Sequence, residues 1–413
     1  MVLPQLARDL AGDARVVALG EGAHNITEFY ELKDELFRLL VEEHGFTAFV
    51  MESGFAEGLE VDAWIHGGPG EVEDVARDGI TYRFGECEPM RRQLTWMRRW
   101  NAASPAKVSF YGMDLPGSST SPGPAVRACL DRLPALPGDE ELRRISDLGG
   151  RTEAAIRYQG MPAARRARLL TLLRDLVERT AAQDDVIVHR CGASIQAFLA
   201  ELDTPQAGPY PREVFMADTV RWILEREERI VVSAHNAHVR RTPLHGRPTL
   251  GGLLGESPAI GESPVIGGSP VVGRSPAIGG SPVVGRSPAI GGSPVVVGMT
   301  YGAGPEVRFT QRSPRPFDCE VSLHERTLPA NAVESRLERL GGPVAVADLR
   351  HAPAGLFDGV DGTLAAGGLD PVDDFPAAYD ALIHFRRVTR VPGAFERLRA
   401  EFDTQSPAEP ESP

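Results

Sequence analysis

The chain has 413 residues, and its 42% hydrophobic content is enough for a sizeable core in one large or two ordinary domains. Its 57 Asp and Glu outnumber 44 Lys and Arg, and the net charge of -13 argues against nucleic acid or an anionic membrane as a partner. The four cysteines form no CxxC pair, so we expect reduced thiols rather than a zinc knuckle or a disulfide framework.

The sequence also lacks signals for export or membrane insertion. No run of about 18 apolar residues occurs, and residues 1–13 hold no basic segment followed by a long apolar one. We therefore expect a cytoplasmic protein with no membrane partner.

Residues 15–25 predict a strand that stops in a Gly-rich turn carrying Glu21 and His24, followed by a helix that begins near Thr27. In an open parallel sheet, ligands bind beyond the carboxyl ends of the strands. The turn therefore lies where catalytic residues are usually placed.

Further strands are predicted at 47–51, running into Glu52, and at 108–113, closed by Asp114. Helical spacing fills the intervals, and strands separated by helices predict parallel βαβ units with right-handed crossovers. We predict an α/β fold: three α/β/α layers with a mostly parallel central sheet, plus an inserted helical subdomain.

The inserted subdomain is predicted at 117–211, where strand signals vanish and 142–157, 163–179 and 184–202 have helical spacing. Residues 1–116 and 212–400 would then form a discontinuous catalytic core. In its second part, a helix at 212–228 leads into a strand at 229–234 that ends in His235 and His238, and further strands are predicted at 295–301 and 344–349.

Residues 256–297 repeat a six-residue unit, X-Ser-Pro-(Ala/Val)-(Ile/Val)-Gly. A hexapeptide period can form a β-helix, but a proline in every unit removes a ladder donor each time. We expect a low-complexity surface loop within the core. The Ser-, Pro- and Glu-rich tail at 404–413 is predicted to be disordered.

Polar residues therefore follow four predicted strands, and parallel strands would bring them to one edge. Two histidines with several carboxylates are typical of an acid/base site, where one histidine takes a proton from water and a carboxylate fixes its tautomer. A second histidine or a cation can stabilise the oxyanion. No Gly-x-Ser-x-Gly elbow, P-loop or Gly-x-Gly-x-x-Gly motif is present, so we expect neither a serine nucleophile nor a cofactor.

Structural interpretations of the same residues stay open. Glu21 could cap the following helix, Glu52 and Asp114 could pair with arginines, and His235 could be a buried core histidine. Lys33, by default, is a solvated charge. Two His and two carboxylates could also bind zinc or iron, but no His-Glu-x-x-His motif occurs, so a metal-free site is the preferred hypothesis.

Short motifs that span most of the chain outside the repeats resemble the erythromycin esterase family. They are GEGAH (20–24), EFYEL (28–32), MESGFAEG (51–58), FYGMD (110–114), Arg212 with MAD (216–218), AHNAH (234–238) and YDAL (379–382).

The resemblance implies a hydrolase that opens the lactone of a macrolide, a small-molecule substrate, without a covalent serine intermediate. His24 matches the base that activates water, and Glu21, Glu52 and His235 match positions that orient the base, the water and the oxyanion. By the same similarity Asp114, Arg212 and His238 support the site or bind substrate. Lys33 matches a position that is commonly arginine, a bidentate fork rather than a point charge.

Family resemblance does not fix the substrate, so two other hypotheses stay open. One is a tailoring enzyme that cyclises, dehydrates or hydrolyses a product of polyketide biosynthesis. The other is a non-catalytic metal-binding protein.

Overall fold

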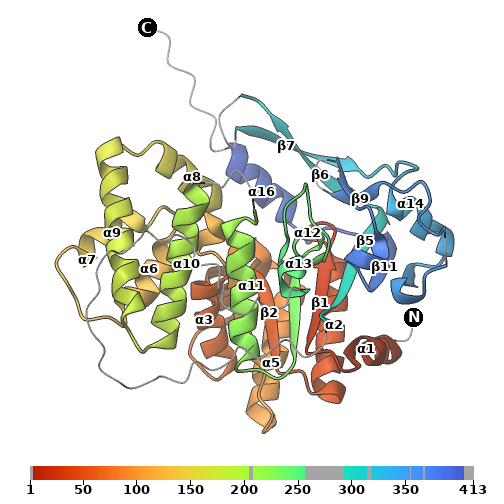
Figure 1. Cartoon of the computed structure of the whole chain (residues 1–413), viewed down its shortest axis with the longest axis horizontal. Coiled ribbons are helices and arrows are strands. Elements are labelled where there is room, and N and C mark those ends of the chain that lie inside the picture. The colour runs from red at the N-terminus through yellow and green to blue at the C-terminus, as the bar shows by residue number, and fades with distance from the viewer. Residues whose placement is uncertain are drawn as a thin grey trace, which may run out of the picture.

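The computed structural model describes residues 3–203, 208–255, 293–313, 318–353, 355–365 and 368–403. Its centre is a seven-stranded sheet with the strand order β3-β2-β4-β1-β5-β11-β8, in which only β8, at one edge, is antiparallel to its neighbour (Figure 1). The strands are β1 (Val16–Glu21), β2 (Ala48–Gly54), β3 (Ser109–Asp114), β4 (Ile230–His235), β5 (Val295–Ala303), β8 (Val344–Asp348) and β11 (Ala381–Arg387).

The central strands are apolar because both faces of the sheet are covered. Every residue of β1 and β2 is buried. Alternate side chains enter different cores, with Val17 and Leu19 in one and Val16 and Ala18 in the other. The predicted α/β class with a mostly parallel central sheet is confirmed.

Helices cover the two faces. The first face packs against α1, α2 and α5, and the second packs against α11, α13, α14 and α15. The bounds are α1 (Leu3–Ala11), α2 (Thr27–His44), α3 (Phe55–Ile65), α4 (Val72–Gly79), α5 (Glu88–Ala103), α11 (Pro211–Leu224), α12 (Asn236–Val239), α13 (Leu250–Gly255), α14 (Val333–Leu337), α15 (Phe375–Ala378) and α16 (Ala394–Asp403).

Five helices between β3 and α11 stand beside the sheet, around a separate core cluster to which α3 and α11 also contribute (Figure 1). The helix predicted at 142–157 is wrong as a single element, because the chain breaks into two helices around Gly149 and Gly150, and Gly149 has a φ of +86°. The five are α6 (Gly123–Leu130), α7 (Asp139–Ser146), α8 (Arg151–Gln159), α9 (Ala163–Ala181) and α10 (Val186–Leu202). The division into a core and an insertion stays a prediction.

Several strands were not predicted, because their sequences lack a regular pattern of polar and apolar residues. Buried β11 holds His384 in its middle, which is accommodated because its Nδ1 lies 2.9 Å from Thr300 Oγ1. Two short antiparallel pairs were also not predicted. They are β6 (Pro305–Gln311) with β7 (Cys319–Glu325), and β9 (Gly362–Ala365) with β10 (Gly368–Pro371).

Most of the repeat tract and the whole predicted tail lie outside the described residues. The last residues of the tract, Val295 to Val297, belong to β5 and pair with Val17 to Leu19 of β1. Among the described residues, no helix is both long and apolar enough to cross a membrane.

Gly20, near the end of β1, tests how tightly the strand ends pack. A Cβ at this position would lie 2.3 Å from Asn236 Oδ1 and 2.7 Å from Val239 Cγ2. We expect Gly20→Ala to lower the free energy of unfolding by about 1–3 kcal/mol in urea titrations, because overpacking forces both neighbours to move. Gly255→Ala, which would meet no atom within 4 Å, is the control. Equal stability of the two variants would contradict this packing.

Candidate active site

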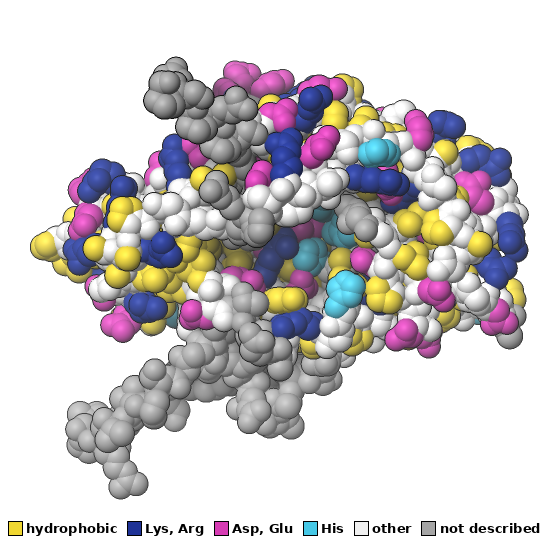
Figure 2. Space-filling model, turned by 90° about the horizontal axis from the view of Figure 1, so that it is seen from above, with side chains coloured by type: hydrophobic (Ala, Val, Ile, Leu, Met, Phe, Trp, Pro, Cys, Tyr) yellow, Lys and Arg dark blue, Asp and Glu magenta, His cyan; other side chains and the backbone are white. Residues whose placement is uncertain are grey.

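The strands β3, β2, β4 and β1 are neighbours in the sheet, so their carboxyl ends meet at one edge. Glu21 of β1 stands in register with His235 of β4, and Glu52 and Asp114 come from β2 and β3. In the space-filling view, histidine, basic and acidic side chains gather in a hollow (Figure 2). The structure thus brings together the residues that sequence reasoning placed at this edge.

The carboxylate of Glu21 holds two partners at once. Its Oε1 lies 2.8 Å from His24 Nδ1, and its Oε2 lies 2.5 Å from Lys33 Nζ. The expectation that Lys33 is a solvated charge is wrong, because its side chain is only 2% exposed and lies over Glu21. Burial by itself would raise the pKa of Glu21, but the charge of Lys33 and the contact with His24 hold it below its usual value.

The ring of His24 is fixed on several sides but stays open to the hollow. Its centroid lies 4.9 Å from that of Phe84 and 5.0 Å from that of His235, and the side chain is 40% exposed. A carboxylate can only accept, so the proton of neutral His24 is on Nδ1 and the lone pair is on Nε2. Glu21 does not cap α2, whose N-cap is Ile26, without a side-chain hydrogen bond.

Glu52 is a shared acceptor at the centre of the site. Its Oε1 accepts from Arg212 Nη2 at 2.8 Å and contacts His238 Nε2 at 3.2 Å, while Oε2 accepts from the backbone N–H of His235 at 2.8 Å. Burial favours a high pKa for Glu52, but His238 and Arg212 outweigh it and hold the pKa well below its usual value. Glu52 is therefore ionised.

Asp114 is fully buried and fixes the same arginine from the other side. Arg212 Nε donates to its Oδ1 at 2.9 Å and Nη2 to its Oδ2 at 2.6 Å, and the Tyr82 hydroxyl donates to Oδ2 at 2.9 Å. Burial opposes the charge of Arg212, but Asp114 raises its pKa well above the usual value. Within the described part of the chain, nothing accepts from Nη1, which leaves its two N–H groups for a ligand.

His235, the last residue of β4, and His238, in the short helix α12 that follows, have opposite ionisation. His238 lies between two carboxylates, with Nδ1 at 2.5 Å from Glu213 Oε1, and although burial lowers its pKa, Glu213 and Glu52 raise it to about 10. Burial and the proximity of His24 lower the pKa of His235 to about 3. His235 Nδ1 accepts from the N–H of Ala237 at 3.1 Å, so the proton of its neutral ring is on Nε2.

Three residues of the site were missed from the sequence. Glu213 follows Arg212 directly, but nothing in the pattern indicated that its side chain would be buried against His238. Tyr82 and Phe84 lie in a 3-10 segment, Thr81–Glu86, whose irregular backbone gives no periodic pattern to read. Among the described residues, no group of three or more His, Cys, Asp or Glu side chains is arranged to hold a metal ion.

A family model described as erythromycin esterase matches residues 41–261, more than half of the chain. The chain belongs to the erythromycin esterase family. It is 29% identical to an erythromycin esterase type II from Escherichia coli over 268 residues, which are 57% of this chain and 63% of that protein. A type I enzyme from the same species is 31% identical over 25% of each chain. The alignments therefore span less than two thirds of these relatives.

Solved structures show the same fold. A mutant erythromycin esterase in an open conformation aligns with a TM-score of 0.66 and 17% identity, covering 94% of each chain. A succinoglycan biosynthesis protein aligns with a TM-score of 0.67 and 18% identity over 94% of this chain and 91% of its own. At this identity the likeness shows the fold alone.

The Glu21–Lys33 pair in this family member predicts a specific stability change. Lys33→Met leaves the buried carboxylate of Glu21 without its cationic partner, so we expect the free energy of unfolding at pH 7 to fall by about 3–5 kcal/mol in urea titrations. In the wild type the lowered pKa of Glu21 contributes stability above pH 4.5 that is lost as pH falls, and the variant loses this contribution.

The control for this variant is Lys107→Met, which removes the same charge from an exposed position. Its ammonium group donates to the carbonyls of Asn101 and Ser104 at the end of α5, so we expect a loss of about 1 kcal/mol, well below that of Lys33→Met. A Lys33→Met protein as stable as the Lys107→Met protein would contradict a buried ion pair.

We expect His235 and His238 to titrate at different pH values when their ring nitrogens are followed by NMR. His238 should stay protonated at pH 7, so its pairing contributes stability that is complete below pH 6.5 and lost as pH rises towards 10. His235 should stay neutral until pH approaches 3, so its burial removes stability as pH falls below 6.5. Glu213→Gln should lower the pKa of His238 and leave His235 neutral at pH 7. Titration of both rings near 6.5 would contradict these assignments.

Proposed function

We propose that this protein is a carboxylic ester hydrolase that opens the lactone of a macrolide or a related bulky ester, with His24 as the base that activates water and no covalent intermediate. The observation that carries the proposal is the contact of His24 Nδ1 with Glu21, which leaves Nε2 free in an open hollow. Membership of the erythromycin esterase family supports the substrate class.

His24 takes the proton from water at Nε2. Glu21 keeps the ring in the tautomer that has its lone pair there, and it stabilises the imidazolium that forms. Lys33 keeps Glu21 ionised and fixes its orientation through the second oxygen. Phe84 and His235 on either side restrict rotation of the ring.

The carbonyl oxygen of the ester, as it becomes an oxyanion, accepts from Arg212 Nη1 and His235 Nε2. Both donors are preorganised. Asp114 and Glu52 hold Arg212, while His235 donates its backbone N–H to Glu52 and accepts the N–H of Ala237 at its ring Nδ1. Fixed donors that need no reorganisation are the main source of catalysis in acyl transfer. Water attacks directly, and His24 then returns its proton to the leaving alkoxide.

The proposal predicts that wild-type protein, incubated with a panel of macrolides and simple esters, gives products whose mass has increased by one water. His24→Asn should lower kcat by about 10²–10⁴-fold, because the contribution of a general base is lost. Mass spectrometry of the products measures both.

The matched control is His351→Asn. His351 also pairs with a carboxylate three residues before it, but it is 81% exposed and lies outside the hollow. Its loss should leave kcat unchanged. Full activity in His24→Asn would refute the assigned base, and the absence of hydrolysis across the panel would refute the proposed activity.

A further inference from the structure

A second cavity, of about 470 Å³, adjoins the candidate active site. Tyr82, whose hydroxyl donates to Asp114, lines both the cavity and the candidate active site. Asn25, the residue after His24, also lines the cavity. A molecule whose ester lies at His24 can therefore extend into this cavity, which has the size of a ligand pocket.

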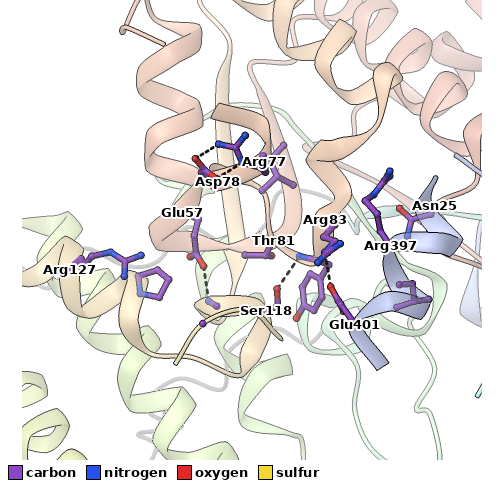
Figure 3. Close-up of a pocket in the computed structure, with 18 residues that line it drawn as sticks. Asn25, Glu57, Arg77, Asp78, Thr81, Arg83, Ser118, Arg127, Arg397 and Glu401 are labelled. Atoms are coloured by element: carbon purple, nitrogen blue, oxygen red, sulfur yellow. Dashed lines mark hydrogen bonds and ion pairs between the residues drawn. The ribbon is translucent and has the colours of Figure 1, made fainter. Parts of the chain in front are cut away.

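The lining charges of this cavity are mostly paired with one another. Arg77 Nε lies 2.9 Å from Asp78 Oδ1, and Arg83 Nε lies 2.6 Å from Glu401 Oε1 (Figure 3). Arg397, at the same end as Asn25, pairs with Glu86 at 2.8 Å. A charged ligand would have to displace these pairs, whereas a neutral polar ligand would not.

Two lining groups keep hydrogen-bonding capacity. Among the described residues, Arg127 pairs with no carboxylate, and it stands at the end of the cavity opposite Arg397 (Figure 3). Glu57 Oε1 accepts from the N–H of Gly117 at 2.7 Å and keeps a second lone pair, while its Oε2 is fully buried beside Gly54. Burial raises the pKa of Glu57 to about 7, so this carboxyl both donates and accepts near neutral pH.

The backbone around the cavity is held in an unfavourable conformation. Asn25, Tyr82, Arg83 and Ser118 all line it and all have a positive φ, between 54° and 60°. For residues other than glycine, this conformation costs about 1–3 kcal/mol each and persists mainly at catalytic and ligand-binding sites. Here it directs the side chains of Arg83 and Ser118 towards the same space as Glu57 and Thr81 (Figure 3).

We propose that this cavity is a subsite for a neutral, hydroxylated part of the substrate, such as a sugar ring, while the ester lies at His24. Each hydroxyl group both donates and accepts, which suits a wall where Arg127 and Asn25 donate and Glu57 and Ser118 also accept. Tyr82 and Leu398 offer apolar surface to the face of a ring. This inference rests on the proposed ester hydrolysis for its catalytic role.

Gly150 lines the cavity, and a Cβ there would meet no atom within 4 Å, so Gly150→Phe adds a bulky ring to the wall of the subsite at a position where the backbone has room for a side chain. We expect it to raise KM for a sugar-bearing macrolactone by about tenfold or more, the equivalent of one or two lost hydrogen bonds. KM for the sugar-free lactone and for a small aryl ester should change by less than about twofold. Gly160→Phe, at the exposed other end of α8, is the control. Arg127→Ala should give a smaller change in the same direction, and Arg132→Ala, at an exposed position that does not line the cavity, is its control.

Binding of methyl glycosides by saturation-transfer NMR provides a readout that needs no turnover. Binding to the wild type and to Gly160→Phe, with loss in Gly150→Phe, supports the subsite even if no ester is hydrolysed. If esters are hydrolysed but Gly150→Phe affects sugar-bearing and sugar-free substrates equally, the subsite is refuted while the proposed hydrolysis stands. Failure of the wild type to bind any glycoside also refutes the subsite.

Discussion

The candidate site depends on one buried carboxylate, Glu52, which holds three groups from three other elements. It fixes Arg212 from the helix α11, His238 from the short helix α12, and the backbone of His235 at the end of β4. Because a buried anion without partners is costly, these contacts are constraints on the fold as well as on the site. The strand order places β2 beside β4, so the sheet itself delivers Glu52 to these partners.

The ionised groups around His24 are four carboxylates and three cations, so the site has one negative charge in excess. When His24 takes a proton from water, its positive charge neutralises this excess, which favours the imidazolium in the proposed reaction. His235 stays neutral beside it and can therefore donate without repelling that charge. The ionised groups are the carboxylates of Glu21, Glu52, Asp114 and Glu213, with Lys33, Arg212 and His238 as cations.

The sequence was sufficient for the parts of the fold and site that depend on local pattern. Apolar runs that end in Glu52, Asp114 and His235 gave the parallel strands and the edge where they meet. Contacts between elements could not be predicted from the sequence. The burial of Lys33 over Glu21, for example, depends on how α2 packs against the sheet. The same limit applies to Glu213, whose partner is 25 residues away, and to β11, whose polar His384 interrupts an apolar strand.

The central claim is that water attacks the ester directly. The most direct test is a single turnover in oxygen-18 water, with the enzyme in excess over a macrolactone. Direct attack predicts that the acid formed in the first turnover contains one labelled oxygen and that the intact mass of the protein never increases by that of the acyl group. Unlabelled acid in the first turnover would show that Glu21, Glu52 or another carboxylate had been the nucleophile. An acylated protein would likewise contradict the claim.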